Sequence, residues 1–541
     1  MMIPATNTSN PAESSHDRLL DRSFLWLCAA FAALKLAIQI IGNVLSQRAG
    51  YGIFRDELYY LMCGRHLALG YVDQPPMVAL QARLTEMLFG FQHMWSLRLI
   101  SALAGAAMVF LVGMLVRSLG GDRRAAALAM LGVIVGSIYL ALDGYLSMNS
   151  FEPVFWIICM LSLIRIVQAS SKGPQAQAEL RNWWIVFGVS AGLGIENKDT
   201  IVFFLLAVLL ALLLTGERRV LFNRWCAVSV AIIFALALPN FLWQVHYHFP
   251  TLEWLMDAKR KGKDVHLPPI GFLKAQILML NPLTVLLWVS GLLWFLIARA
   301  ARPYRFLGVL YLIFLPMMMA LNAKDYYLAP IYVVYFAGGA VCWLHWMGDT
   351  AWRSVIVSVY ALLLVLGFII TVPFSIPILP PHQFIAYEQR IGFKPKDSEV
   401  HAATALPQFY ADRFGWHRMV QQIAAVYSAL PPDERAVTGI YVQNYGEASA
   451  INLFGPKYGL PVAISGHQSY WLWGPHGYTG KEMILFNVDP ISRLRREYGS
   501  CQIVGEINNR WAMPYEHGPI ILCKDRIESY SVDWAHHKVY Y

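Results

Sequence analysis

The sequence predicts a polytopic α-helical membrane protein that carries a C-terminal α/β domain. Of the 541 residues, 57% are hydrophobic and 14% are charged, whereas soluble domains contain about 25% charged residues. Apolar segments of about 20 residues, the length that crosses a bilayer, follow one another until Val372 and then stop. Beyond Pro380, short β-rich runs alternate with helical stretches, which is typical of an α/β domain. These observations exclude an ordinary soluble enzyme.

We predict about eleven transmembrane helices. Their approximate limits are Leu25–Leu45, Leu97–Val116, Ala125–Leu142, Val154–Val167, Trp183–Ile195, Ile201–Leu214, Cys226–Trp243, Ile277–Ile297, Phe306–Leu321, Leu328–Trp346 and Val355–Val372. Arginine-rich loops recur after every second span, and such loops face the cytoplasm. This pattern makes residues 1–22 a cytoplasmic tail and residues 23–375 the transmembrane domain. It places residues 380–541 on the outer side of the membrane.

The outer domain is expected to combine five strands with three helices. The strands are predicted at Val437–Val442, Pro461–Ser465, Met483–Val488, Gln502–Ile507 and Ile520–Cys523, and the helices at Trp416–Leu430, Gly446–Phe454 and Ile491–Tyr498. The seven cysteines are too few and too scattered for a zinc cluster. Cys501 and Cys523 lie in or beside strands of a domain in an oxidising compartment, so we expect a disulfide between them.

The net charge of +9 does not indicate nucleic-acid binding. A nucleic-acid interface gathers basic residues on one face, often with aromatic residues between them. No such stripe is present here, and loop arginines that set membrane topology account for the excess. We therefore expect no nucleic-acid partner.

Two adjacent carboxylates, Asp56 and Glu57, follow the first predicted span in the segment FRDELYY at residues 54–60. One interpretation is that they favour the positive N-terminal end of an amphipathic helix that runs to Leu69. The other is that one of them is a general base on an acceptor hydroxyl or amine. The residues alone leave both interpretations open.

With four further motifs, this loop resembles the bacterial branch of the dolichyl-phosphate-mannose protein mannosyltransferase superfamily, glycosyltransferase family 39. The motifs are GYVDQPP at residues 70–76, KDYYLAP at 324–330, NYGEA at 444–448 and GPKYG at 455–459. Members of the superfamily are GT-C fold glycosyltransferases that use polyprenyl-phosphate sugars, and the aminoarabinose transferases of lipid A are relatives. In the aminoarabinose branch a lysine stands directly before the proline of this motif, whereas Gln74 stands before Pro75 here. The resemblance therefore does not determine which sugar is transferred.

The resemblance implies which acidic residues act. Asp56 matches the catalytic acidic residue of the family, which is expected to activate the acceptor, and Glu57 is a weaker candidate. Asp143 and Glu152 match the position of a second acidic loop. Either residue could orient the acceptor, hold a divalent metal ion or pair with a cation. The structural alternative is a helix cap at Asp143 and a paired carboxylate at Glu152. No cofactor is certain.

The resemblance also implies a set of donor contacts. The donor phosphate needs cations, and the candidates are Lys198, Lys324 and Arg55. Lys198 could instead form a salt bridge with Glu196 or Asp199, or extend toward the membrane interface. The residues expected to line the substrate are Tyr59, Tyr60, Tyr326 and Tyr327.

These features predict an inverting hexosyl- or pentosyltransferase with a polyprenyl-phosphate sugar donor. Its acceptor is a lipid, a glycan or a protein at the outer face of the inner membrane. The alternative is a transporter or flippase of a lipid-linked or small polar substrate. That alternative predicts ionisable residues within the spans and inverted repeats, whereas the candidate charges lie at span ends.

Overall fold

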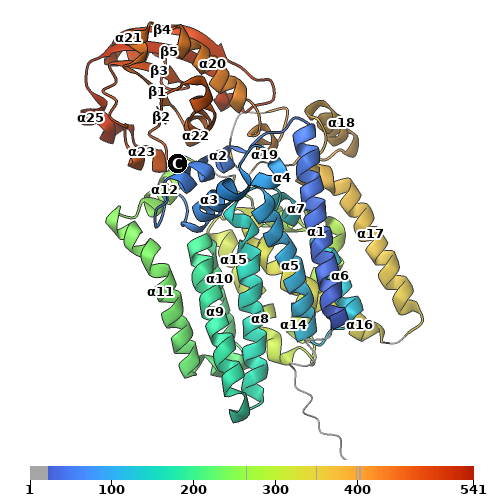
Figure 1. The fold of residues 1–541 in the computed structure, drawn as a ribbon. Coiled ribbons are helices and arrows are strands. Elements are labelled where there is room, and N and C mark those ends of the chain that lie inside the picture. The colour runs from blue at the N-terminus through green and yellow to red at the C-terminus, as the bar shows by residue number, and fades with distance from the viewer. Residues whose placement is uncertain (1–21, 263–264, 349, 396, 398, 401–403) are drawn as a thin grey trace, which may run out of the picture.

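The structure is a computed structural model that describes residues 22–262, 265–348, 350–395, 397, 399–400 and 404–541. Long helices form a bundle, and the C-terminal domain covers one end of it (Figure 1). The predicted cytoplasmic tail lies outside the described residues, apart from Arg22, where the first helix begins.

A helix is present at each predicted span. The bundle helices are α1 (Arg22–Arg48), α5 (Leu99–Ser118), α6 (Arg123–Ile134), α7 (Ser137–Leu142), α8 (Glu152–Ser171), α9 (Gln177–Asn197), α10 (Thr200–Leu213), α11 (Arg224–His246), α13 (Pro269–Met279), α14 (Val285–Ile297), α15 (Arg305–Ala320), α16 (Ala329–Met347) and α17 (Trp352–Ser375). Among the described residues, seven helices are long and apolar enough to cross a membrane, or eight if one bent pair is a single span. The expected count of about eleven is therefore not confirmed. The chain breaks between α6 and α7, α10 has only 14 residues, and α13 meets α14 at a 98° bend.

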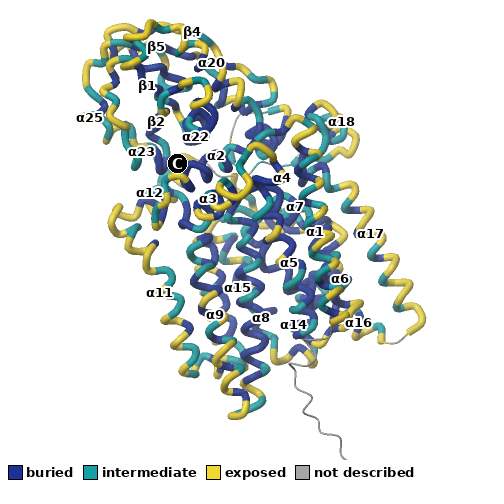
Figure 2. The backbone as a smooth tube through the Cα atoms, viewed as in Figure 1, coloured by how far each residue is buried: buried dark blue, intermediate teal, exposed yellow. Residues whose placement is uncertain are grey.

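Figure 2 shows many exposed residues along α11 and α17 at the outside of the bundle. Only 11% of the apolar stretch of α11 and 17% of that of α17 is buried, against 83% for α8 and for α16. Phe234 on α11 is 71% exposed and Leu362 on α17 is 59% exposed. Water disfavours such surfaces and hydrocarbon does not. The protein is a multi-pass membrane protein.

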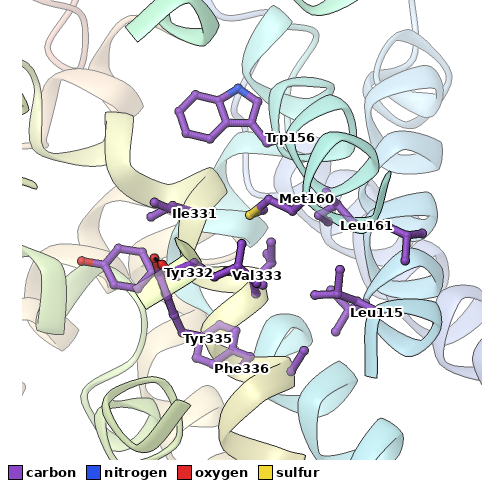
Figure 3. Packing of buried hydrophobic residues seen from close by; sticks show 14 of the residues in the cluster. Leu115, Trp156, Met160, Leu161, Ile331, Tyr332, Val333, Tyr335 and Phe336 are labelled. Atoms are coloured by element: carbon purple, nitrogen blue, oxygen red, sulfur yellow. Dashed lines mark hydrogen bonds between the residues drawn. The ribbon is translucent and has the colours of Figure 1, made fainter. Parts of the chain in front are cut away.

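Helices α8 and α16 form the centre of the bundle. Figure 3 shows Trp156 and Met160 of α8 among the buried side chains of α16. Trp156 stacks on Phe204 of α10 with ring centroids 4.1 Å apart. Helix α16 also packs closely against α14. The approach is possible because Gly339 of α16 has no Cβ atom, which would meet the carbonyl of Leu287 of α14. Such small-residue contacts let helix backbones approach closely in membranes.

Short helices lie between the bundle and the C-terminal domain (Figure 1). They are α2 (Arg55–Arg65), α3 (Met77–Phe89), α4 (Met94–Leu97), α12 (Pro250–Arg260), α18 (Pro381–Ile391) and α19 (Gln408–Ala411). Two short 3₁₀ segments, η1 (Met148–Ser150) and η6 (Asp325–Leu328), lie close to them in the loops before α8 and α16.

The C-terminal domain contains one five-stranded sheet. Its elements are α20 (Trp416–Ala429), α21 (Pro432–Arg435), β1 (Thr438–Val442), α22 (Tyr445–Phe454), β2 (Ala463–Ile464), α23 (Ser469–Trp473), β3 (Glu482–Phe486), α24 (Ile491–Glu497), β4 (Tyr498–Ile507), β5 (Gly518–Arg526) and α25 (Tyr530–Asp533). The strand order is β2-β1-β3-β5-β4. Strand β1 pairs in parallel with β2 and β3, and β5 is antiparallel to β3 and β4. All five predicted strands are present, and Cys501 of β4 forms a disulfide with Cys523 of β5.

Candidate active site

The first turn of α2 holds Asp56 and Glu57 in different environments. Glu57 is fully buried and accepts hydrogen bonds from Arg98 Nε and Nη2, both at 2.8 Å. It also accepts from the backbone nitrogens of Phe54 at 2.8 Å and Leu146 at 2.7 Å. Burial alone would raise the pKa of Glu57, but Arg98, Arg413 and the backbone hydrogen bond from Leu146 together more than offset burial, and the pKa falls below its usual value. These contacts leave the carboxylate closed to substrate, so the expected catalytic role of Glu57 is not supported.

Asp56 remains accessible. Its side chain is 30% exposed. Its Oδ1 accepts a 2.8 Å hydrogen bond from the Tyr445 hydroxyl and lies 3.8 Å from Arg55 Nε. A carboxylate held by a neutral donor, with solvent access, is suited to proton abstraction.

Arg55 binds the C-terminal domain instead of facing open solvent. It donates from Nη1 to the Tyr515 hydroxyl at 2.8 Å, and Nη2 lies 3.9 Å from Asp412 and from Glu399. Its guanidinium lies 5.4 Å from the centre of the Tyr445 ring. Because carboxylates already surround this cation, the predicted role as a donor-phosphate ligand is not supported.

The second acidic loop pairs with lysines. Asp143 lies 2.9 Å from Lys35 of α1, and both side chains are buried. Glu152 lies 2.8 Å from Lys198 and also contacts Thr200. Of the roles left open by the sequence, pairing with a cation is therefore the one that the geometry favours for both carboxylates. Lys35 was not singled out from the sequence, although an ionisable residue within a span is a recognisable signal.

The two candidate lysines lie near the paired tyrosines of η6. Lys198 Nζ donates to Asn149 Oδ1 at 2.8 Å and lies 4.3 Å from the centre of the Tyr327 ring and 5.5 Å from that of Tyr326. Its ion-pair partner is Glu152, not Glu196 or Asp199. Lys324 Nζ lies 3.5 Å from Glu399, the carboxylate that also approaches Arg55.

The four candidate tyrosines fall into two groups. Tyr326 and Tyr327 are partly exposed beside Lys198 and remain candidates for substrate contact. Tyr59 is buried, with its hydroxyl 2.9 Å from Asp73 and 2.8 Å from Ser469 of α23, so it joins α2 to the C-terminal domain. Tyr60 is also buried. The prediction that Tyr59 and Tyr60 line the substrate is not supported.

Three residues with contacts in this region were not singled out from the sequence. Arg98 holds Glu57, Glu399 lies between Arg55 and Lys324, and Tyr445 donates to Asp56. The motif at residues 444–448 contains Tyr445, so this signal was available without a role attached to it. Arg98 and Glu399 stand in no motif.

A divalent metal ion at the acidic residues of this region is not supported among the described residues. In the part of the chain that the structure describes, no group of three or more His, Cys, Asp and Glu side chains could hold a metal ion. Asp143 and Glu152 already face lysines.

The chain is similar to known glycosyltransferases in sequence and in fold. Residues 73–243 match the model of the dolichyl-phosphate-mannose-protein mannosyltransferase family. The structure of ArnT from Cupriavidus metallidurans bound to undecaprenyl phosphate aligns over 91% of this chain and 97% of its own, with a TM-score of 0.56 and 15% sequence identity. The resemblance to GT-C glycosyltransferases is confirmed. At this identity the structural similarity concerns the GT-C fold itself.

Two curated relatives match parts of this GT-C chain. The lipid A galacturonosyltransferase RgtD of Rhizobium johnstonii is 28% identical over 210 residues, which cover 38% of this chain and 41% of the relative. The undecaprenyl phosphate-alpha-4-amino-4-deoxy-L-arabinose arabinosyl transferase of Pseudomonas savastanoi pv. phaseolicola is 24% identical over 238 residues, 43% of this chain and 42% of the relative. The match thus spans about two fifths of the length of each relative.

Proposed function

We propose that the protein is an inverting glycosyltransferase that moves a sugar from a polyprenyl-phosphate donor to an acceptor. The observation that carries this proposal is the state of Asp56. Three nearby carboxylates, Glu57, Asp143 and Glu152, are buried against cations, whereas Asp56 is partly exposed and hydrogen-bonded to a neutral hydroxyl. Asp56 also stands where the family resemblance expects the catalytic carboxylate.

In the proposed reaction Asp56 takes the proton of an acceptor hydroxyl or amine. The acceptor oxygen or nitrogen then forms a bond to the anomeric carbon while the bond from that carbon to the phosphate oxygen breaks. The polyprenyl phosphate leaves with the bonding electron pair. Because this is a direct displacement, the anomeric configuration inverts and no covalent sugar intermediate on the protein is needed.

The leaving phosphate requires positive charge, and Lys324 and Lys198 are the proposed sources. Lys324 is partly exposed, and its Nζ lies 3.5 Å from Glu399. Lys198 donates to Glu152 and Asn149, both at 2.8 Å. We propose that Lys324 binds the phosphate directly and that Lys198 adds positive potential nearby.

The membrane arrangement belongs to the same proposal. The arginine-rich loops would face the cytoplasm, and the α2 end of the bundle and residues 380–541 the periplasm. A donor anchored by a lipid has to be met at the membrane surface, and the proposed orientation puts α2 and η6 there. The curated relatives are named for the transfer of galacturonate to lipid A and of 4-amino-4-deoxy-L-arabinose from undecaprenyl phosphate. Both sugars and lipid A are therefore the first substrates to test.

The test compares purified wild-type protein with Asp56→Asn, using synthetic undecaprenyl-phosphate sugars and a panel of lipid, glycan and peptide acceptors. Product is detected by mass spectrometry, and its anomeric configuration by NMR. We expect Asp56→Asn to lower kcat by at least about 100-fold, in the range of a lost general base, while binding of undecaprenyl phosphate is unchanged. An Asp56→Asn protein of normal activity, or a product of retained configuration, would remove the proposed mechanism.

A further inference from the structure

The C-terminal domain meets α2 at the place where an open α/β sheet usually binds a ligand. Strand β1 lies between β2 and β3 and runs parallel to both, so the chain leaves it toward one side and returns on the other. The carboxyl ends of the strands form a crevice at such a switch point. Here α22 starts just after β1 and lies over α2 (Figure 1). A Cβ atom at Gly446 would lie 2.5 Å from Arg55 Cγ, which shows how close the two helices are.

We propose that Tyr445, the first residue of α22, is a positioning residue that orients and tunes the carboxylate of Asp56. This inference rests on the proposed function, because it assumes that Asp56 is the base. The direct evidence is the 2.8 Å hydrogen bond from the Tyr445 hydroxyl to Asp56 Oδ1, which joins residues 389 positions apart. The C-terminal domain then completes the active site without contacting the reacting atoms itself.

The ring of Tyr445 is fixed on two sides. It stacks on His467 with centroids 4.9 Å apart and an angle of 24° between the planes, and it packs on Tyr59 at 4.7 Å. The side chain is 7% exposed. A ring held in this way keeps its hydroxyl at one place, as a positioning group must. Burial also raises the pKa of Tyr445 well above its usual value, so the hydroxyl stays protonated and donates.

The backbone that carries Tyr445 is fixed as well. Asn444 caps α22 by accepting hydrogen bonds from the nitrogens of Gly446 at 2.8 Å and Glu447 at 3.0 Å. Glu447 Oε2 accepts in return from the nitrogen of Asn444, and its Oε1 accepts from Asn487, which follows β3. The motif NYGEA at residues 444–448 therefore builds a rigid helix start at the switch point.

A hydrogen bond to an ionised carboxylate stabilises that form and lowers its pKa. Loss of the Tyr445 hydroxyl is therefore expected to remove one hydrogen bond from the ionised carboxylate of Asp56 and to release its orientation. The charged and titratable groups that face Asp56 are Arg55, Tyr60, Tyr145, Asp412 and Tyr445. All except Tyr445 are unchanged in a Tyr445→Phe variant, so a difference between the two proteins reports the lost hydroxyl.

The test measures the pH dependence of kcat/KM for wild type, Tyr445→Phe and a matched control, Tyr427→Phe. The control removes a hydroxyl that donates to the Arg435 carbonyl at 2.9 Å elsewhere in the same domain. For Tyr445→Phe we expect the acid limb to move up by roughly 0.5–1 pH unit and kcat to fall about 10-fold with little change in KM, as for a lost hydrogen bond to a charged group. Tyr427→Phe should match wild type.

The variant Asp56→Asn is measured beside them to separate the two proposals. If Asp56→Asn is inactive and the Tyr445→Phe profile superimposes on wild type, Tyr445 has no positioning role although the base assignment stands. If Asp56→Asn is active, both proposals fail. A purely structural role of Tyr445 would lower kcat equally at every pH without moving the limb, and that result also overturns the inference.

Discussion

The first turn of α2 and the loop between α7 and α8 each bring two carboxylates to the same end of the bundle (Figure 1). In the α7–α8 loop both carboxylates meet a lysine from elsewhere in the chain: Asp143 meets Lys35 and Glu152 meets Lys198. In α2 only Glu57 meets a cation at hydrogen-bond distance, whereas Asp56 accepts a hydrogen bond from a tyrosine and lies 3.8 Å from Arg55. A carboxylate buried against a cation is thus a structural group, while Asp56, held by a neutral donor, keeps 30% of its side chain exposed.

The largest expected effect is on stability, from Glu57→Gln. This change leaves Arg98 buried without its charge partner, and breaking a buried ion pair costs about 3–5 kcal/mol. Unfolding of the detergent-solubilised protein, followed by intrinsic fluorescence, measures this loss. The transfer rate per folded molecule is expected to stay within about 3-fold of wild type, since Glu57 has no role in the proton transfer proposed for Asp56.

Glu86→Gln is the matched control. Glu86 of α3 pairs with Arg65 of α2 at 2.6 Å, and both side chains are partly exposed. Exposed pairs contribute about 0–1 kcal/mol. If Glu57→Gln were as stable as Glu86→Gln yet inactive, Glu57 would be the functional carboxylate of α2 and the comparison would be reversed.

Variants of the Lys35–Asp143 pair test whether a carboxylate buried against a cation has only a structural role. Lys35→Met or Asp143→Leu alone is expected to destabilise by about 3–5 kcal/mol, because the other charge stays buried. The double variant is expected to recover to within about 1–2 kcal/mol of wild type, since two apolar groups replace the pair. Activity that returns together with stability would show that Asp143 only supports the bundle. A stable but inactive double variant would show a direct role in the reaction.

The sequence predicts the helices of this fold well and their lateral contacts poorly. Apolar runs set each span because hydrocarbon requires them. Breaks such as Ile134 to Ser137 depend on which polar groups the surrounding helices satisfy, so the apolar runs alone do not determine the number of membrane crossings. In the C-terminal domain, alternating β-rich runs sufficed to locate all five strands.

In the candidate site too, local sequence motifs were predictable and contacts between distant residues were not. Asp56 was found because a local motif surrounds it. The partners that distinguish it from Glu57 come from far along the chain: Arg98 lies 41 residues from Glu57, and Tyr445 lies 389 residues from Asp56. The contacts of Arg55 could not be predicted for the same reason, since Tyr515 and Asp412 belong to a different domain. Local sequence carries residue type, whereas three-dimensional packing decides which charges meet.

A smaller effect is expected from the two lysines. We expect replacement of Lys324 to change donor binding and replacement of Lys198 to change both rate and stability. Lys324→Met should raise the KM for donor about 10- to 100-fold at nearly constant stability, as expected for a lost charge-assisted contact. Lys198→Met also leaves Glu152 buried and unpaired, so its rate defect should come with lower stability. Steady-state kinetics with the donor and unfolding curves of both variants test this. An unchanged KM in Lys324→Met would remove its proposed phosphate contact.

The smallest effect concerns a third carboxylate pair, Glu447 and Glu516. These two groups interact with each other, whereas Glu57, Asp143 and Glu152 each pair with a cation. Both are buried, Glu447 in the first turn of α22 and Glu516 in the 3₁₀ segment before β5, and Glu516 accepts a 3.4 Å hydrogen bond from Asn444. Burial raises the pKa of both groups, and that of Glu516 reaches about 8. Because the folded-state pKa is raised, the stabilising contribution is complete below the unfolded-state pKa. It is lost as pH rises through about 8.

Glu516→Gln cannot ionise, so the domain should lose less stability between pH 5 and pH 8 than wild type does. We expect the two proteins to be similar near pH 5 and the variant to be more stable at pH 8 by on the order of 1–2 kcal/mol. Hydrogen exchange of β1 and β3 amides in the full-length protein measures this, with Glu506→Gln, at an exposed position on β4, as control. Parallel pH curves for wild type and Glu516→Gln would mean that Glu516 is ionised in the folded domain. Glu516 would then resemble the cation-paired carboxylates, with the nearby Arg55 compensating its charge.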